Sequence, residues 1–168
     1  MKKTITLICG LVLSSTLIAQ TCPNKVPQTT PTKDFSINGD GTVTHLKTGM
    51  MWSQCSMGQQ WTNNQCEGNV LELDWAIAME MANEADLAGY SDWRLPDIKE
   101  IDLLVERACY NPAINLTVFP QTPPLFYWSN TPDTYGPGAA WRLYFHYGDI
   151  YYYSYKYNQS AVRLVRRP

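Results

Sequence analysis

The stretch GYSDWRLPDIKEIDLLVERAC, residues 89–109, carries the clearest helix signal in the chain. Asp97 and Glu100 have the D-x-x-E spacing of a capping box, in which each side chain accepts a backbone hydrogen bond at the start of a helix. Apolar residues then recur at helical spacing on one face, namely Ile98, Ile101, Leu104, Val105 and Ala108. The pattern predicts an amphipathic helix from Asp97 to about Cys109, whose other face carries solvated charges such as Glu106.

The segment before this stretch predicts another helix. In LDWAIAMEMANEADLAG, residues 73–89, Asp74 is a good N-cap. The apolar face that follows consists of Trp75, Ala78, Met79 and Ala82. Its methionines are expected to fill the core, and Gly89 belongs to the loop after the helix.

Turn residues organise the N-terminal third. The Pro- and Thr-rich residues 22–34 predict an extended lead-in. Residues 34–52, DFSINGDGTVTHLKTGMMW, then have the alternation of a hairpin with a turn at residues 38–41. The acidic and amide oxygens of this turn also suit a calcium loop, but the bidentate glutamate that such a loop needs is missing.

The last third of the chain predicts strands. Short runs rich in aromatic and β-branched residues cover residues 125–133, 139–149, 150–157 and 161–167, with Gly, Pro, Asn and Asp between them. Helices followed by a set of antiparallel strands indicate an α+β domain. The 168-residue length fits one such domain, here residues 35–168.

Seven tyrosines lie within residues 143–157. Alternation places Leu143 and Phe145 on a core face. After the Gly148-Asp149 turn it places Tyr151, Tyr153, Tyr155 and Tyr157 together on one face. Cross-strand aromatic packing explains part of this excess. So many buried hydroxyl groups would be hard to satisfy, however, so the sequence favours a tyrosine-rich recognition surface.

The first 21 residues have the pattern of a secretory signal peptide, with two lysines, an apolar run and small residues before the cleavage site. Cleavage could follow Ala19, or Thr21 with Ala19 at the third position before the cut. The residues before Cys22 make a poor lipoprotein signal, so an exported protein without a lipid anchor is expected in the periplasm, on the outer surface or in the medium.

The cysteines outside the signal peptide are Cys22, Cys55, Cys66 and Cys109. An even number in an exported chain predicts two disulfides, with three possible connectivities. The most local bond would join Cys55 to Cys66. Cys22 would then pair with Cys109 and attach the lead-in to the rest of the domain. A zinc site would need C-x-x-C spacing, which is missing.

Charge and motifs exclude several functions. The formal net charge of −2 becomes about −4 without the two signal-peptide lysines, which disfavours nucleic acid as a partner. The C-terminal arginines Arg163, Arg166 and Arg167 are expected to be solvated charges on a terminal strand. No P-loop, HExxH, GxSxG or dinucleotide motif accompanies His45 or His146, so neither a catalytic site nor a cofactor is predicted.

Six segments in order resemble the Lcl C-terminal domain family: DGTVTHLKTGMMW, AGYSDWRLPDIKEID, CYNPAIN, FPQTPPLFYWSNTPD, AAWRLYFHYGD and VRLVR. The most specific is GYSDWRLP. The resemblance implies a C-type-lectin-like fold of the formylglycine-generating-enzyme kind, in which two helices flank a twisted antiparallel sheet and the terminal strands pair. It also implies a structural role for Asp92, Trp93, Arg94 and Pro96, with Arg94 bound to carbonyls or a carboxylate at the helix start.

For function, the resemblance is informative mainly through the motifs of related proteins that this sequence lacks. The calcium-binding sugar motifs of C-type lectins are missing, as is the reactive cysteine pair of the formylglycine-generating enzymes, so no metal is predicted. We therefore expect a non-enzymatic lectin-like binding domain for a glycan or a host or cell-surface protein; a structural or assembly module of the envelope is second and an enzyme third. The predicted ligand face contains Tyr144, His146, Tyr151, Tyr153 and Tyr155, with Trp128 nearby. Residues 144–160 also have the composition of strands that retroelements diversify in some exported lectin-like proteins.

Overall fold

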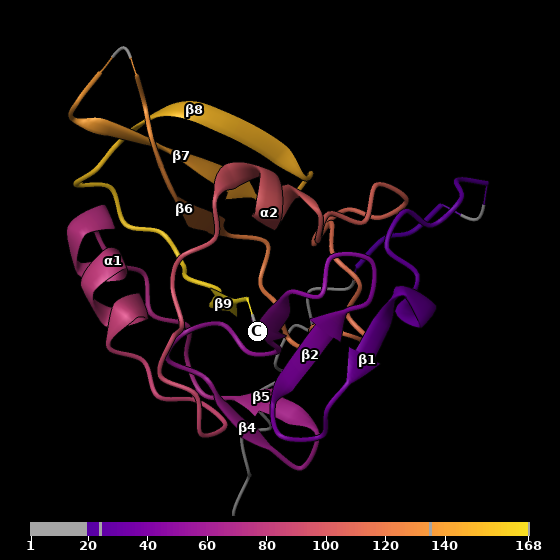
Figure 1. Ribbon diagram of the computed structural model, residues 1–168. Coiled ribbons are helices and arrows are strands. Elements are labelled where there is room, and N and C mark those ends of the chain that lie inside the picture. Colours follow the sequence, from indigo (N-terminus) through magenta and orange to yellow (C-terminus); the bar gives the residue numbers. More distant parts are fainter. Residues whose placement is uncertain (1–19, 24, 135, 168) are drawn as a thin grey trace, which may run out of the picture.

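The computed structural model describes residues 20–23, 25–134 and 136–167 (Figure 1). Within these residues the chain is of the mixed α+β class, as predicted, with antiparallel strands and two short helices. The strands form three separate sheets, in the orders β1-β2-β3-β9, β4-β5 and β6-β7-β8. In Figure 1 the sheet of β6, β7 and β8 lies at one end of the molecule, and β1, β2 and the β4-β5 hairpin lie at the other.

The first sheet begins with the predicted hairpin. Its strands are β1 (Phe35–Ile37), β2 (Thr42–His45), β3 (Met51–Ser53) and β9 (Val165–Arg166). In the turn between β1 and β2, the carboxylate of Asp40 accepts hydrogen bonds from the backbone and the hydroxyl group of Thr42. This oxygen therefore closes the turn. The C-terminal strand β9 joins the N-terminal sheet, as the resemblance implied, but it pairs with β3.

The first helix follows its prediction. Helix α1 (Trp75–Asn83) starts at Asp74, whose side chain accepts a hydrogen bond from the backbone of Ile77 at 3.0 Å. Ala78 and Ala82 are buried on its inner face, in a cluster with Trp93 and Trp128.

The second helix is shorter than predicted. Helix α2 (Ile98–Asp102) has the expected capping box, with hydrogen bonds in both directions between Asp97 and Glu100. After Asp102 the chain makes tight turns, because Val105 pairs as a bridge with Ile114 and so leaves the helical path. The predicted apolar face is nevertheless buried throughout. Burial was thus predicted correctly and helix length was not.

Glu106 corrects a second expectation. It is buried, with 2% of its surface exposed, where a solvated charge was predicted. Its carboxylate accepts hydrogen bonds from the backbone N–H groups of Thr29, Thr30 and Ala108, each at 2.9 Å. Glu106 therefore fastens the lead-in to the domain.

The lead-in is also fastened by a disulfide. Cys22 is bonded to Cys109, and Cys55 to Cys66, so the predicted connectivity is confirmed. The lead-in ends in a 3-10 turn at Thr32–Asp34. The predicted signal peptide lies outside the described residues except for Gln20 and Thr21.

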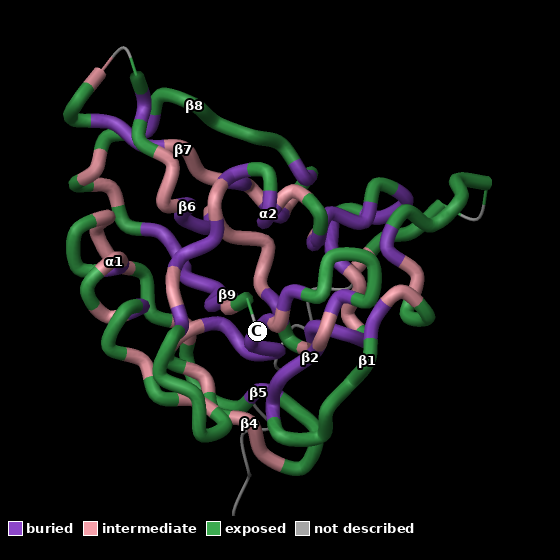
Figure 2. The backbone as a smooth tube through the Cα atoms, in the orientation of Figure 1, coloured by how far each residue is buried: buried purple, intermediate pink, exposed green. Residues whose placement is uncertain are grey.

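The third sheet consists of the predicted aromatic strands, β6 (Phe126–Pro132), β7 (Ala139–Tyr144) and β8 (Asp149–Tyr155). Helix α2 contacts β6 and β7, and α1 contacts β6. Strand β8 forms one edge of this sheet and is exposed along most of its length (Figure 2). The remaining strands, β4 (Gln60–Thr62) and β5 (Gln65–Glu67), form a hairpin near the Cys55–Cys66 disulfide.

Arg163 is fully buried, which corrects the expectation of a solvated charge. Its guanidinium donates to the carbonyl oxygens of Ser53 and Gln54 and to the hydroxyl oxygen of Thr122. Desolvation lowers the pKa of Arg163. This arginine therefore joins the β3 end of the first sheet to the C-terminal segment. Arg166 is paired with Asp92 and has only 11% of its side chain exposed, so of the three arginines Arg167, at 68%, is the one that is solvated as predicted.

Candidate functional site

Aromatic side chains gather on one face of the β6-β7-β8 sheet. The ring of Tyr144 stacks on that of Phe126, with 4.2 Å between the ring centroids. Tyr151 lies edge-on to Phe126 at 5.1 Å. His146 stacks beside Tyr144 at 5.5 Å, and Tyr147 packs edge-on against His146 at 4.1 Å. We call these five side chains the aromatic platform: Phe126, Tyr144, His146, Tyr147 and Tyr151.

The platform combines support with exposure. Phe126, Tyr144 and His146 are half-buried, whereas 58% of Tyr147 and 42% of Tyr151 are exposed. Exposed aromatic rings can stack against flat apolar faces of a ligand, and tyrosine hydroxyl groups can both donate and accept hydrogen bonds. This arrangement can bind a ligand that is apolar on one side and rich in hydroxyl groups at its edge.

Arg142 supports the platform from within the sheet. Its guanidinium carbon lies 3.8 Å from the centroid of Phe126 and 5.8 Å from that of Trp128, which is cation–π geometry. One nitrogen donates to the hydroxyl oxygen of Ser160 at 3.2 Å. Burial lowers the pKa of Arg142, and the neighbouring Tyr151 acts in the opposite direction. Arg142 thus holds Phe126 in place.

Three other tyrosines form a second aromatic group. The rings of Tyr153 and Tyr155 are 5.4 Å apart, and those of Tyr155 and Tyr157 are stacked at 5.2 Å with 8° between their planes. A hydrogen bond with Tyr155 raises the pKa of Tyr153. All three side chains are exposed. We call Tyr153, Tyr155 and Tyr157 the tyrosine ladder.

A β-bulge separates the ladder from the platform. The pairs on either side of it are Arg142 with Tyr151 and Ala140 with Ser154, so that β8 advances by three residues while β7 advances by two. Residues directly opposite each other project to the same face of a sheet. Tyr151 and Ser154 therefore share the platform face, and Tyr153 and Tyr155 project to the other one. Of the four tyrosines predicted to share a face, Tyr153, Tyr155 and Tyr157 do group together, and Tyr151 does not, because regular alternation does not continue through a bulge.

Trp128 also needs correction, since it lies opposite Arg142 on the platform face but is not exposed. It is fully buried and packs in the cluster that contains Ala78 and Ala82 of α1. Its indole N–H donates to the carbonyl oxygen of Leu73 at 2.8 Å. Helix α1 covers this part of β6, so Trp128 belongs to the core.

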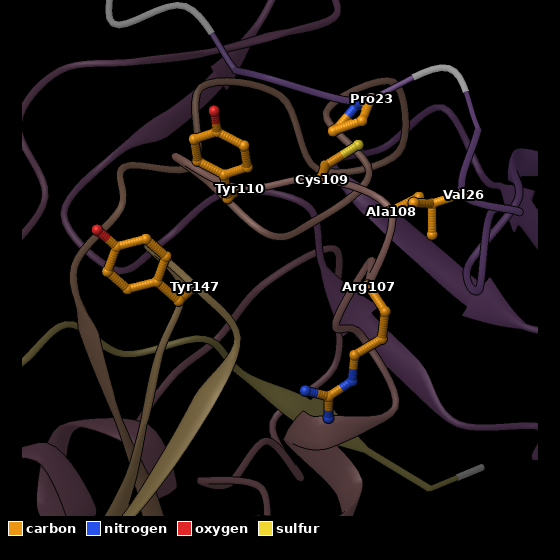
Figure 3. A pocket seen from close by; sticks show the side chains of 7 residues that line it. All are labelled: Pro23, Val26, Arg107, Ala108, Cys109, Tyr110 and Tyr147. Carbon is orange, nitrogen blue, oxygen red and sulfur yellow. The ribbon is translucent and has the colours of Figure 1, made fainter.

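A pocket of about 270 Å³ adjoins the platform (Figure 3). In Figure 3 the rings of Tyr110 and Tyr147 stand on one side, and Pro23 and Val26 stand on the other. Tyr147 belongs to both the pocket and the platform, which makes them one continuous surface. The remaining lining residues are Arg107, Ala108 and Cys109.

Arg107 supplies the charge at this pocket. Its guanidinium donates to the carbonyl oxygen of Gly148 at 2.9 Å and to the carboxylate of Asp102 at 2.6 Å. The side chain is therefore fixed against the turn that precedes β8, and its charge is already paired. The pocket is mainly apolar and aromatic.

Sequence reasoning identified part of this surface. It named Tyr144, His146 and Tyr151, which the sheet brings together, and it missed Phe126 and Tyr147. Phe126 lies directly opposite Tyr144 in the β6-β7 ladder, so the correct strand register would have revealed it. The pocket residues gave no local signal, because distant segments bring Tyr110 and Tyr147 together.

The GYSDWRLP segment lies away from this surface, at the start of α2. Arg94 binds the carboxylate of Glu100 through two nitrogens, at 2.7 and 2.8 Å, and also donates to the carbonyl oxygen of Leu95. Burial raises the pKa of Glu100, but the hydrogen bonds from Arg94 and from the backbone of Asp97 outweigh this and leave it lowered. The pair thus extends the capping box.

The other residues of this segment also make structural contacts. Asp92 pairs with Arg166 at 2.6 Å, and the buried Trp93 donates to the carbonyl oxygen of Leu87 at 3.1 Å. The carbonyl oxygen of Pro96 accepts a backbone hydrogen bond from β6. These contacts tie the segment to β9 and β6.

No group of three or more His, Cys, Asp or Glu side chains in the described ranges could hold a metal ion. His45 is buried against Phe35, with its Nδ1 2.8 Å from the hydroxyl oxygen of Thr48, and burial lowers its pKa. No helix among the described residues is long and apolar enough to cross a membrane.

Comparison with known proteins identifies the family of the chain. Searches of curated proteins and of solved structures found nothing similar. The profile of the Lcl C-terminal domain matches residues 41–166, which contain both helices, strands β2 to β9, the platform and most of the pocket. The chain belongs to the Lcl C-terminal domain family.

Proposed function

We propose that this protein is an exported, non-enzymatic binding domain, and that the aromatic platform with its adjoining pocket recognises carbohydrate. The observation that carries this proposal is the gathering of five aromatic rings on one sheet face and the turn after β7, continuous with a pocket that two tyrosines line.

Physical chemistry favours this ligand class. The C–H faces of pyranose rings pack against aromatic rings, and tyrosine hydroxyl groups match sugar hydroxyl groups as donors and acceptors. Tyrosine also provides a large contact area at a low cost in conformational entropy, as in antibody binding sites. The rings of Phe126 and Tyr144 are held by stacking before a ligand arrives, which reduces the ordering that binding requires.

The disulfides fit an exported protein. Two bonded pairs indicate an oxidising, extracytoplasmic setting. The sulfur of Cys22 is bonded to that of Cys109, so in this state it cannot also carry a thioether-linked lipid. We infer a protein without a lipid anchor in the periplasm, on the outer surface or in the medium.

A glycan array tests the proposal. The purified chain without its signal peptide is compared with a Tyr147→Ala, Tyr151→Ala variant of the platform and a Tyr153→Ala, Tyr155→Ala variant of the ladder. The ladder variant is a matched control, since it removes two exposed tyrosines from β8, the strand that also carries Tyr151. We expect the platform variant to lose binding and the ladder variant to keep it. Unchanged glycan binding by the platform variant would reject the assigned surface.

A second function is an assembly module of the cell envelope. Strand β8 is a sheet edge with exposed tyrosines on both faces, and such an edge suits pairing with another protein. In that case the array would show no glycan binding, and envelope proteins would co-purify with the chain. The ladder variant would no longer co-purify with them.

A further inference from the structure

Two residues upstream of Cys22 are built into the fold. The side-chain amide of Gln20 donates to the carbonyl oxygens of Pro112 and Ile114, at 2.7 and 2.6 Å. The backbone of Thr21 exchanges two hydrogen bonds with that of Tyr110, at 2.9 and 2.8 Å. Four hydrogen bonds therefore attach this dipeptide to residues 110–114.

The segment that they hold leads directly to the candidate site. The backbone N–H groups of Asn111 and Ala113 donate to the carbonyl oxygens of His146 and Phe145. Tyr110 lines the pocket opposite Pro23, and His146 belongs to the platform. A continuous set of hydrogen bonds thus runs from Gln20 and Thr21 through residues 110–114 to the end of β7.

Removal of the dipeptide would leave buried groups unsatisfied. Pro112 and Ile114 are both buried, and their carbonyl oxygens accept from the Gln20 amide. A buried carbonyl group that loses its donor is costly. The native fold therefore favours a mature chain that keeps both residues.

We propose that signal peptidase cuts the bond between Ala19 and Gln20, so that the mature protein begins at Gln20. Water is added across this peptide bond, which leaves a carboxylate on Ala19 and an amine on Gln20. The sequence also permits a cut after Thr21, but this would discard all four hydrogen bonds. Processing as a lipoprotein would require a lipid on the sulfur of Cys22, which is bonded to Cys109.

The mature N-terminus then has a structural role. Gln20 and Thr21 form a clasp that holds Tyr110 at the pocket, while the neighbouring disulfide fixes Cys22.

Peptide mapping of the exported protein tests the cleavage site. The full precursor is expressed in a bacterium with its own signal peptidase, and the N-terminal peptide is identified by mass spectrometry. We expect this peptide to start at Gln20, with the glutamine either unmodified or cyclised to pyroglutamate. A start at any other residue, including an acylated Cys22, would overturn the proposal.

Thermal unfolding tests the clasp separately. Chains that begin at Gln20 or at Cys22 are exported behind the same foreign signal peptide. We expect the longer chain to melt higher by about 2–8 °C, since its buried carbonyl groups keep their donors. In the longer chain, Gln20→Ala should lower the melting temperature, whereas Gln28→Ala, an exposed glutamine of the same lead-in, should not. Equal melting temperatures for the two chains would refute the clasp.

Discussion

The guanidinium carbon of Arg142 lies 3.8 Å from the ring centroid of Phe126, on the same sheet face as the aromatic platform. The contact joins the platform to the interior, because Arg142 also reaches the buried Ser160 and lies near the buried Trp128. A surface assembled in this way keeps its shape before any ligand binds.

Replacement of Arg142 by alanine should destabilise the fold. The change removes a cation–π contact and a charged hydrogen bond, so we expect a loss of about 2 kcal/mol in the free energy of unfolding, measured with urea. Arg142→Lys should recover less than half of this, because an ammonium group lacks the planar face that stacks on Phe126. Lys99→Ala, on the exposed side of α2, serves as the control. Full recovery by lysine would mean that charge alone matters here.

Replacement of Glu106 should lower the stability of the fold more than replacement of an exposed charged residue. Glu106→Gln puts an amide group opposite the backbone donors of Thr29, Thr30 and Ala108, so we expect a loss of about 2–3 kcal/mol. Urea unfolding measures it, with the exposed Glu80→Gln as the matched control. A loss no larger than that of the control would show that the lead-in is not held by this carboxylate.

The same carboxylate should make stability depend on pH. Burial raises the pKa of Glu106, but the hydrogen bonds from Thr29, Ala108 and Thr30 outweigh it and leave the pKa below its usual value. The contribution is therefore complete above about pH 4.3, the usual glutamate pKa, and disappears as the pH falls through the lower folded-state value. The stability gap between the wild type and Glu106→Gln should shrink between pH 7 and pH 3. A constant gap would contradict this account.

The two disulfides should contribute unequally. They close loops with sequence separations of 87 and 11 residues. On the chain-entropy relation, replacement of Cys22 and Cys109 by serine should cost about 4–5 kcal/mol, and replacement of Cys55 and Cys66 about 3 kcal/mol. Denaturant unfolding of the two double variants under identical conditions gives the comparison. A greater loss from the short loop would contradict the ranking.

Gly148 should tolerate no side chain. Its φ angle is +80°, and a Cβ atom there would lie 2.5 Å from a methyl group of Val105. Gly148→Ala therefore adds a clash to the usual cost of a left-handed backbone, and we expect a loss of about 2–4 kcal/mol by thermal or urea unfolding. At Gly39, with a φ angle of +83° and open space around it, alanine should cost only about 1 kcal/mol. Similar losses at both positions would show that the clash is relieved by movement.

Local signals in the sequence were sufficient for much of the fold. The caps of both helices lie in the sequence itself, and so does the alternation that buries Leu143 and Phe145. Tertiary contacts decided the rest. The bridge between Val105 and Ile114 shortens α2, and backbone donors from the lead-in draw Glu106 into the interior.

The candidate site was harder to predict for the same reason. A bulge in β8 is not visible in the spacing of the tyrosines, and it moves Tyr153 and Tyr155 away from Tyr151. The burial of Trp128 depends on where α1 packs, which the sequence of β6 does not contain. Only the strand register and the packing of α1 distinguish a platform tyrosine from a ladder tyrosine or a core tryptophan.

The most direct test of the platform is the affinity of two single variants for the glycan that the wild type binds best. Tyr151→Ala removes a platform ring, and Tyr155→Ala removes a ladder ring of nearly equal exposure from the same strand, 42% against 44%. Isothermal titration calorimetry measures both dissociation constants, with melting temperatures as a check on folding. We predict that Tyr151→Ala weakens binding at least about tenfold, or about 1.4 kcal/mol, and that Tyr155→Ala stays within about twofold of the wild type. An equal loss in both variants, or a loss in Tyr155→Ala alone, would contradict the assignment of the binding face.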